Sequence, residues 1–116
     1  MKVFGLAVLR QKDDEQGAVF LGKALDVTSF NWFKRGFVSE GLNFVMRSFA
    51  ATLPPQSREV APHETDGQKY VASGFVNRQG LAAVVIATED VPQLLTFKLC
   101  AMATEAFLKV RRNLVS

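Results

Sequence analysis

The chain has 116 residues, of which 48% are apolar, and a formal net charge of +3. These values suit one folded domain with a single core, and they exclude an intrinsically disordered chain. The single cysteine excludes an internal disulfide framework, and the longest apolar run, Leu81 to Ala87, is too short to cross a bilayer.

The first part of the chain predicts two strands. Residues 2–10 alternate with apolar side chains on both faces, which indicates a central strand covered on both sides. The polar stretch 11–17 is typical of a hairpin connection, and the β-forming residues that follow predict a second strand over 18–25. The aromatic residues Phe30, Trp32 and Phe33 come next. They either form a surface patch or, as we favour, plug the corner between sheet and helix.

The stretch from Gly36 to Leu53 predicts a helix with two apolar faces. At about 100° per residue, six side chains form an ordinary core stripe. Its members are Val38, Leu42, Val45, Met46, Phe49 and Leu53. Phe37, Gly41 and Phe44 form a second, narrower patch, with Phe44 about 150° from the middle of the stripe.

Two interpretations of Phe44 follow. Its ring is either half-buried beneath the loop of residues 54–64, or it forms one wall of a groove between this helix and an edge strand near Val60. Such a groove would receive an apolar segment, because an open edge strand beside an apolar helix face suits an added peptide or helix.

The remainder of the chain predicts three more strands and a second helix. Pro54 and Pro55 end the first helix, and Pro62 confines a short strand at 59–61 to a sheet edge. Strands at 69–76 and 81–87 flank a tight turn, and a long helix opens near Pro92 and runs to about Arg112, with Phe97 and Phe107 in the core. Residues 1–116 are thus expected to form one α+β domain, an antiparallel sheet covered by two helices.

The residues offer little catalytic chemistry. His63 reads as a solvated loop side chain and Cys100 as a small buried hydrophobe, so an enzyme that pairs them is a remote alternative. No metal spacing, phosphate-binding loop or nucleophile elbow is present, and we expect no cofactor and no enzyme activity. Lys109, Arg111 and Arg112 are expected to complement the dipole at a helix end. The alternative is contact with an anionic membrane surface or nucleic acid, but the stripe of cations that nucleic-acid binding needs is absent.

Three stretches resemble a known family. Asp26-Val-Thr-Ser-Phe-Asn-Trp-Phe-Lys-Arg35, Val38 through Phe44, and Gly80-Leu-Ala-Ala-Val-Val-Ile-Ala87 with Pro92 are similar to the longin domain of R-SNAREs, above all the lipidated branch without a transmembrane segment, the Ykt-six type. The resemblance covers nearly the whole chain. It implies a profilin-like fold, with a five-stranded antiparallel sheet between one helix and the C-terminal helical region.

The resemblance also implies a function. In this family the longin domain folds back on its own SNARE motif and shelters a prenyl or palmitoyl anchor in an apolar groove, and the key groove phenylalanine falls on Phe44. The SNARE motif and the lipidated cysteine pair are expected to lie outside this chain. Other SNAREs and trafficking factors are the further partners, and the full-length protein would be cytoplasmic and cycle to Golgi, endosomal or vacuolar membranes, touching them only peripherally.

Two departures from the family pattern fall in the groove. Gly41 stands where a bulky apolar residue is common, and Phe37 where a small polar one is. The two are one turn apart, so Phe37 could fill the space vacated at Gly41. The leading hypothesis is a regulatory domain of a vesicle-trafficking R-SNARE, with a groove formed by Phe44, Phe37, Gly41 and Val60; the alternative is a longin-like adaptor subunit with a constitutive interface.

Overall fold

The computed structural model describes residues 2–12, 17–65 and 67–115, the side chains of 65, 114 and 115 excepted. Its centre is a five-stranded sheet in the order β2-β1-β5-β4-β3, in which all neighbouring strands are antiparallel. The strands are β1 (Val3–Gln11), β2 (Ala18–Leu25), β3 (Arg58–Thr65), β4 (Gln68–Val76) and β5 (Leu81–Ala87). Most of the predicted connection at 11–17 lies outside the described residues.

The sheet order explains the hydrophobic patterns of its strands. β1 and β5 lie inside the sheet, and every residue of β5 is buried, as an apolar run without alternation predicts. β2 and β3 are the two edge strands. Pro62 lies in β3, where proline is tolerated because an edge strand pairs with only one neighbouring strand. The five-stranded α+β fold expected from the sequence is confirmed.

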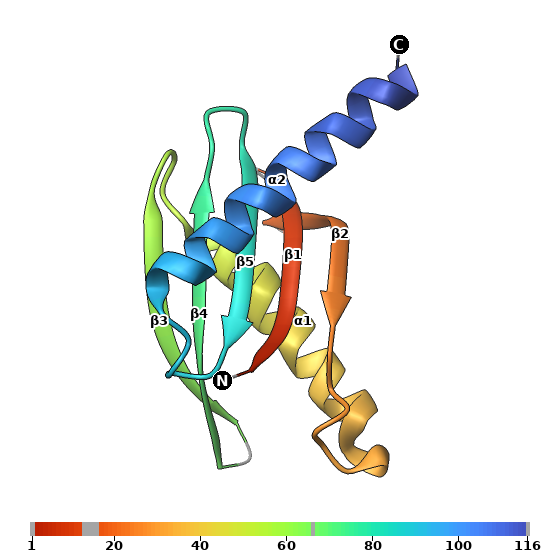
Figure 1. Cartoon of the computed structure of the whole chain (residues 1–116), viewed down its shortest axis with the longest axis vertical. Helices are drawn as coiled ribbons and strands as arrows, with labels where there is room; N and C mark the ends of the chain where they lie inside the picture. The colour runs from red at the N-terminus through yellow and green to blue at the C-terminus, as the bar shows by residue number, and fades with distance from the viewer. Residues whose placement is uncertain (1, 13–16, 66, 116) are drawn as a thin grey trace.

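One helix covers each face of the sheet (Figure 1). α1 (Arg35–Thr52) follows a short 3₁₀ turn, η1 (Trp32–Lys34), and buries the predicted core stripe, with Val45 half-buried and the other five residues of the stripe buried. Gly74 of β4 lets this helix approach closely, because a Cβ there would lie 2.9 Å from the Phe49 ring and 2.8 Å from the Ala83 carbonyl oxygen.

α2 (Gln93–Val115) crosses the opposite face diagonally, over β1, β4 and β5 (Figure 1). It begins directly after Pro92, whose carbonyl accepts from the N–H groups of Leu95 and Thr96. Ala83, Val85 and Ala87 of β5 pack against Cys100, which is buried on the inner side of α2. Phe97 and Phe107 are half-buried rather than in the core as expected, because α2 lies over the sheet with only one side.

β3 differs most from its prediction. The strand runs over eight residues, where a three-residue strand was expected, because the polar residues on both sides of Val60 also pair with β4. Val60 pairs with Ser73, and Ala61 with Ala72. Since Ala61 and Ala72 belong to the core under α1, and side chains alternate along a strand, Val60 points to the α2 face.

Candidate functional site

The outer face of α1 carries two large aromatic side chains in solvent. Phe37 is 73% exposed and Phe44 is 72% exposed, while Leu42 and Met46 on the inner side are buried. The interpretation in which a loop half-buries Phe44 is therefore wrong. Phe37, Gly41 and Phe44 lie within about 60° on the helix surface and form one strip, which we call the outer strip of α1.

A cleft opens beside the outer strip at Gly41. It holds about 100 Å³ and its walls are almost entirely apolar, lined by Phe37, Gly41 and Leu42 of α1 together with Phe4, Phe30, Val38, Gln68 and Tyr70. A Cβ at Gly41 would meet no atom within 4 Å. Phe37 does not fill this space, contrary to expectation, because its ring extends into solvent at the rim. The missing side chain at Gly41 therefore leaves a hollow.

The cleft has walls that the sequence did not single out. Phe30 and Phe4 pack with ring centroids 5.7 Å apart, and Tyr70 lies across from them on β4. Tyr70 lies on the side of β4 that faces α1. The alternation of side chains along this strand could have predicted its place in the cleft, had the face of the strand that packs on α1 been known. Phe30 is close in sequence to Trp32 and Phe33, and only the fold separates its role in the cleft from theirs.

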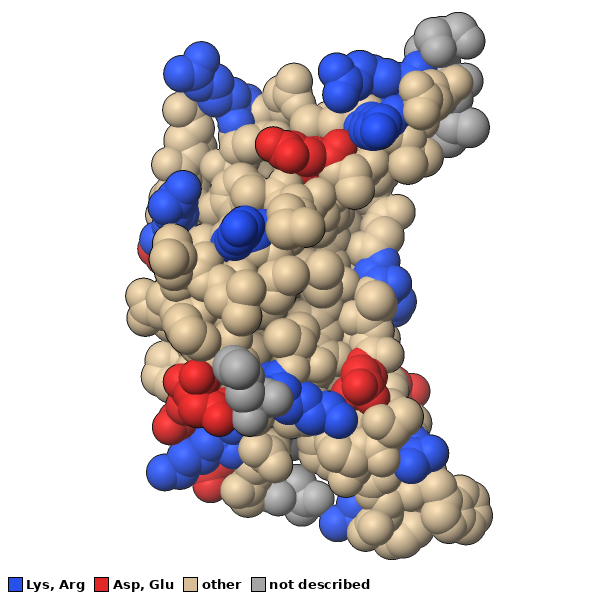
Figure 2. Space-filling view, viewed as in Figure 1, with Lys and Arg blue, Asp and Glu red and all other residues tan. Residues whose placement is uncertain are grey.

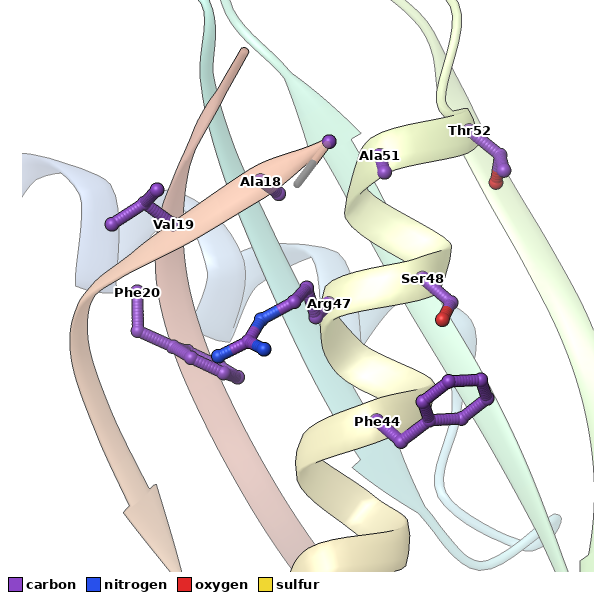
Figure 3. Close-up of a pocket in the computed structure, with 9 residues that line it drawn as sticks. Ala18, Val19, Phe20, Phe44, Arg47, Ser48, Ala51 and Thr52 are labelled. Carbon is purple, nitrogen blue, oxygen red and sulfur yellow. The ribbon is translucent and has the colours of Figure 1, made fainter. Parts of the chain in front are cut away.

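A second, wider hollow lies on the other side of α1, against β2 (Figure 3). Ala18 and Phe20 of β2 face Arg47 and Ala51 of α1 across it. The Lys23 ammonium lies 4.6 Å and the Arg47 guanidinium 5.1 Å from the centre of the Phe20 ring, so cations cover this aromatic. Phe44 also lines this hollow from α1, although in Figure 3 its ring extends away from Phe20.

Val60 does not belong to the groove. The prediction placed it there because β3 is an edge strand, but the strand presents Ala61 and His63 to the α1 side and Val60 to the α2 side. The geometry thus brings together Phe37 and Gly41, puts Phe44 one turn along the same strip, and leaves Val60 apart.

The aromatic residues before α1 divide into two sets. Phe30 packs on the core as expected, but Trp32 is 79% and Phe33 is 65% exposed, so the plug prediction is wrong for these two. Their rings meet edge to face with centroids 6.1 Å apart. The reason is that Phe30 alone fills the corner next to Phe4, and η1 then turns the chain outward.

Cys100 and His63 cannot act together. Cys100 is fully buried between α2, to which it belongs, and the sheet, and burial raises the pKa of its thiol to about 12. His63 lies on the opposite face of the sheet, where its ring stacks on Tyr70 at 5.7 Å; it is a half-buried strand residue, not the solvated loop residue that was expected. The sheet separates the thiol from the imidazole, so this pair supplies no base-activated nucleophile.

Other kinds of site find no support in the described part of the chain. No group of three or more His, Cys, Asp or Glu residues comes together there in a way that could hold a metal ion. No helix within the described residues combines the length and the apolarity that crossing a bilayer requires.

The loop before η1 is held by Asp26. Its carboxylate accepts hydrogen bonds from the Thr28 hydroxyl and N–H, and these bonds lower the pKa of the carboxyl.

Curated relatives match nearly the whole length of the chain. The VAMP-like protein YKT61 of Arabidopsis thaliana is 32% identical over 94% of this chain and 52% of its own length. The synaptobrevin homologues YKT6 of Yarrowia lipolytica and Schizosaccharomyces pombe are 27% and 25% identical, each over 93% of this chain. The chain spans about half the length of the curated relatives it matches. No protein-family profile matches it.

An antiparallel five-stranded sheet covered by one helix on each face is a longin-like α+β architecture. The relatives, aligned over nearly the whole chain, are R-SNAREs of the YKT6 type. The resemblance found in the sequence is therefore confirmed: over nearly its whole length the chain is similar to R-SNAREs of the YKT6 type, and its fold is longin-like.

Proposed function

We propose that this chain is the regulatory domain of a vesicle-trafficking R-SNARE, and that the outer strip of α1 binds the SNARE motif and shelters the lipid anchor of the full-length protein. The observation that carries the proposal is the exposure of Phe37 and Phe44 beside an apolar cleft of about 100 Å³. Two exposed phenylalanines on one helix face cost solubility unless a partner covers them.

The energetics suit a reversible switch. Burying one phenylalanine ring contributes about 1.5–3 kcal/mol, which changes an open–closed equilibrium by about ten- to a hundredfold. A closed form of the full-length protein would be cytoplasmic and autoinhibited, and an open form would expose the anchor for cycling to Golgi, endosomal or vacuolar membranes. No catalytic step enters this function.

The cleft at Gly41 suits the lipid or a bulky side chain of the occupant, because its lining offers almost no hydrogen-bonding groups. A glycine at this position makes the cleft deeper than any side chain would. Gly41→Leu would place a branched side chain in the opening, and we expect it to reduce the uptake of a prenyl group more than the binding of a peptide without one.

The test uses the Phe44→Glu variant, titrated with the SNARE-motif peptide of a YKT6-type relative and with a farnesylated C-terminal peptide, and read by amide chemical shifts. We expect both affinities to fall at least about tenfold, because a carboxylate replaces an apolar contact. The matched control is Met102→Glu, since Met102 is 56% exposed on α2, across the sheet from the outer strip.

Unchanged binding of both peptides by Phe44→Glu would overturn the groove assignment, and so would an equal loss in Met102→Glu. If the wild-type domain binds neither peptide but captures a defined trafficking subunit through Phe44, the adaptor function replaces the regulatory one. Phe44 is largely in solvent, so circular dichroism should show both variants folded.

A further inference from the structure

A second apolar surface, separate from the cleft at Gly41, lies at the start of α1. Trp32 and Phe33 are 79% and 65% exposed, and neither lines a described hollow of the structure. The segment that carries them lies at one end of the molecule, at the lower right of Figure 1, and the C-terminal end of α2 lies at the other end. We call this pair of side chains the aromatic tip.

The backbone that carries the aromatic tip is firmly held. The Arg35 guanidinium donates to the carbonyl oxygens of Phe30 at 3.1 Å and Thr28 at 3.0 Å. Phe30 anchors the same segment by packing on Phe4, and the N–H of Lys34 donates to the Asn31 carbonyl at 2.8 Å. The two rings therefore project from a fixed platform, and their exposure is a property of the fold.

The charges around the tip are mostly positive. Lys34 and Arg35 follow it directly in the chain, and Lys2 lies at the base of the preceding loop. Asp26 is the carboxylate described in this loop; it pairs with the Lys2 ammonium at 3.7 Å and accepts from Thr28. The charges of Lys2 and Asp26 offset each other, so the positive excess at the tip comes from Lys34 and Arg35. In Figure 2 the outermost atoms at this end are uncharged, with Lys and Arg side chains beside them.

Tryptophan next to phenylalanine, flanked by lysine and arginine, has the chemistry of the membrane interface. Amphipathic rings settle at the level of the lipid headgroups, and cations within a Debye length of an anionic leaflet each add about 1 kcal/mol of attraction. A protein partner would need an apolar pocket for the two rings and acidic groups around it for the cations. An anionic bilayer offers an apolar interior and negatively charged headgroups over its whole surface.

From these observations we propose that the aromatic tip inserts into the interfacial region of an anionic bilayer, with the neighbouring cations toward the headgroups. The contact involves two side chains and a few charges, so it is weak and reversible by itself. It does not use the outer strip, and it would set the orientation of the domain at a membrane.

Trp32 is the single tryptophan of the chain, so its fluorescence reports on the tip directly. The full 116-residue chain is mixed with vesicles of phosphatidylcholine containing about 30% phosphatidylserine. We expect the emission to shift to the blue and to be quenched by lipids brominated near the headgroup. Pure phosphatidylcholine vesicles or high salt should reduce the partitioning several-fold.

Two variants locate the contact. Phe33→Ser should lower the partition coefficient about tenfold, while Phe44→Ser, a loss of the same ring at a similarly exposed site, should leave it unchanged. An unshifted emission on anionic vesicles would overturn the proposal. So would a blue shift that depends on protein concentration without lipid, which would indicate a second copy on the tip, or a loss caused by Phe44→Ser and not by Phe33→Ser. None of these outcomes bears on peptide binding by the outer strip.

Discussion

At the scale of single residues, Cys100 shows how burial removes the reactivity that a cysteine brings. Its side chain points from α2 to the sheet and is fully buried, and the Sγ atom lies 3.8 Å from the Ser73 carbonyl oxygen. Desolvation penalises the thiolate and raises the pKa of the thiol from 9.0 to about 12. The sequence predicted a buried hydrophobe, and this prediction is confirmed.

We expect the native chain to resist thiol reagents. With a pKa of about 12, only about one Cys100 thiol in 10,000 is ionised at pH 8, against about one in ten for an unfolded chain. Labelling by a disulfide reagent such as DTNB at pH 8 should therefore be slow in buffer and fast in denaturing urea. Rapid labelling of the folded protein would contradict the burial of Cys100.

The same shift makes stability depend on pH in a defined direction. The pKa of the Cys100 thiol is higher in the folded state than in the unfolded state, so its contribution is complete below pH 9.0 and is lost as the pH rises toward about 12. In this window the free energy of unfolding of the wild type should fall with pH by up to about 1.4 kcal/mol per pH unit more than that of Cys100→Ala. Urea midpoints of both proteins across the window measure this difference.

At the scale of elements, the residues of α1 that stabilise the fold and those proposed to bind a partner lie on opposite sides of the helix. Met46 lies fully buried against the sheet, while Phe44, two residues away, extends into solvent. Met46→Ala should destabilise the domain by about 2–5 kcal/mol, because it leaves a cavity under the helix. Phe44→Ala should change the free energy of unfolding by less than about 0.5 kcal/mol. Urea unfolding of both variants tests the contrast, and comparable losses would show that Phe44 has a structural role.

Helical periodicity was sufficient to predict both faces of α1, because angular spacing depends only on the number of residues between two positions. The same reasoning could not decide whether Phe44 was covered, since that depends on where the loop after Pro55 runs. In the structure this loop leads directly into β3 and leaves Phe44 exposed.

Predictions at the edge strand were weaker for a related reason. The face to which a strand residue points changes with a register shift of a single residue, so the prediction for Val60 required the pairing with β4 to be known. Polar residues in β3 hid both the length of the strand and its register. The aromatic tip was mispredicted because composition does not tell how many rings fit one corner, and Phe30 alone fills it.

At the scale of the whole molecule, the sheet order sets a gradient of stability. β5 lies at the centre with every residue buried, and β2 and β3 each have one unpaired side. Amides on the outer sides of the edges can exchange through small local openings, whereas those of β5 need global unfolding. This gradient provides a way to determine where an occupant binds.

The last prediction concerns hydrogen exchange with and without the SNARE-motif peptide of a YKT6-type relative. In the free domain we expect the amides of β5 and β1 to exchange slowest. With the peptide bound, α1 should gain protection near Phe37 and Phe44, and β3 should not, because the groove side chains belong to the helix and Val60 points to the other face. Gained protection along β3 would instead indicate a strand added to the edge of the sheet, since such a strand takes its hydrogen bonds from the unpaired side of β3.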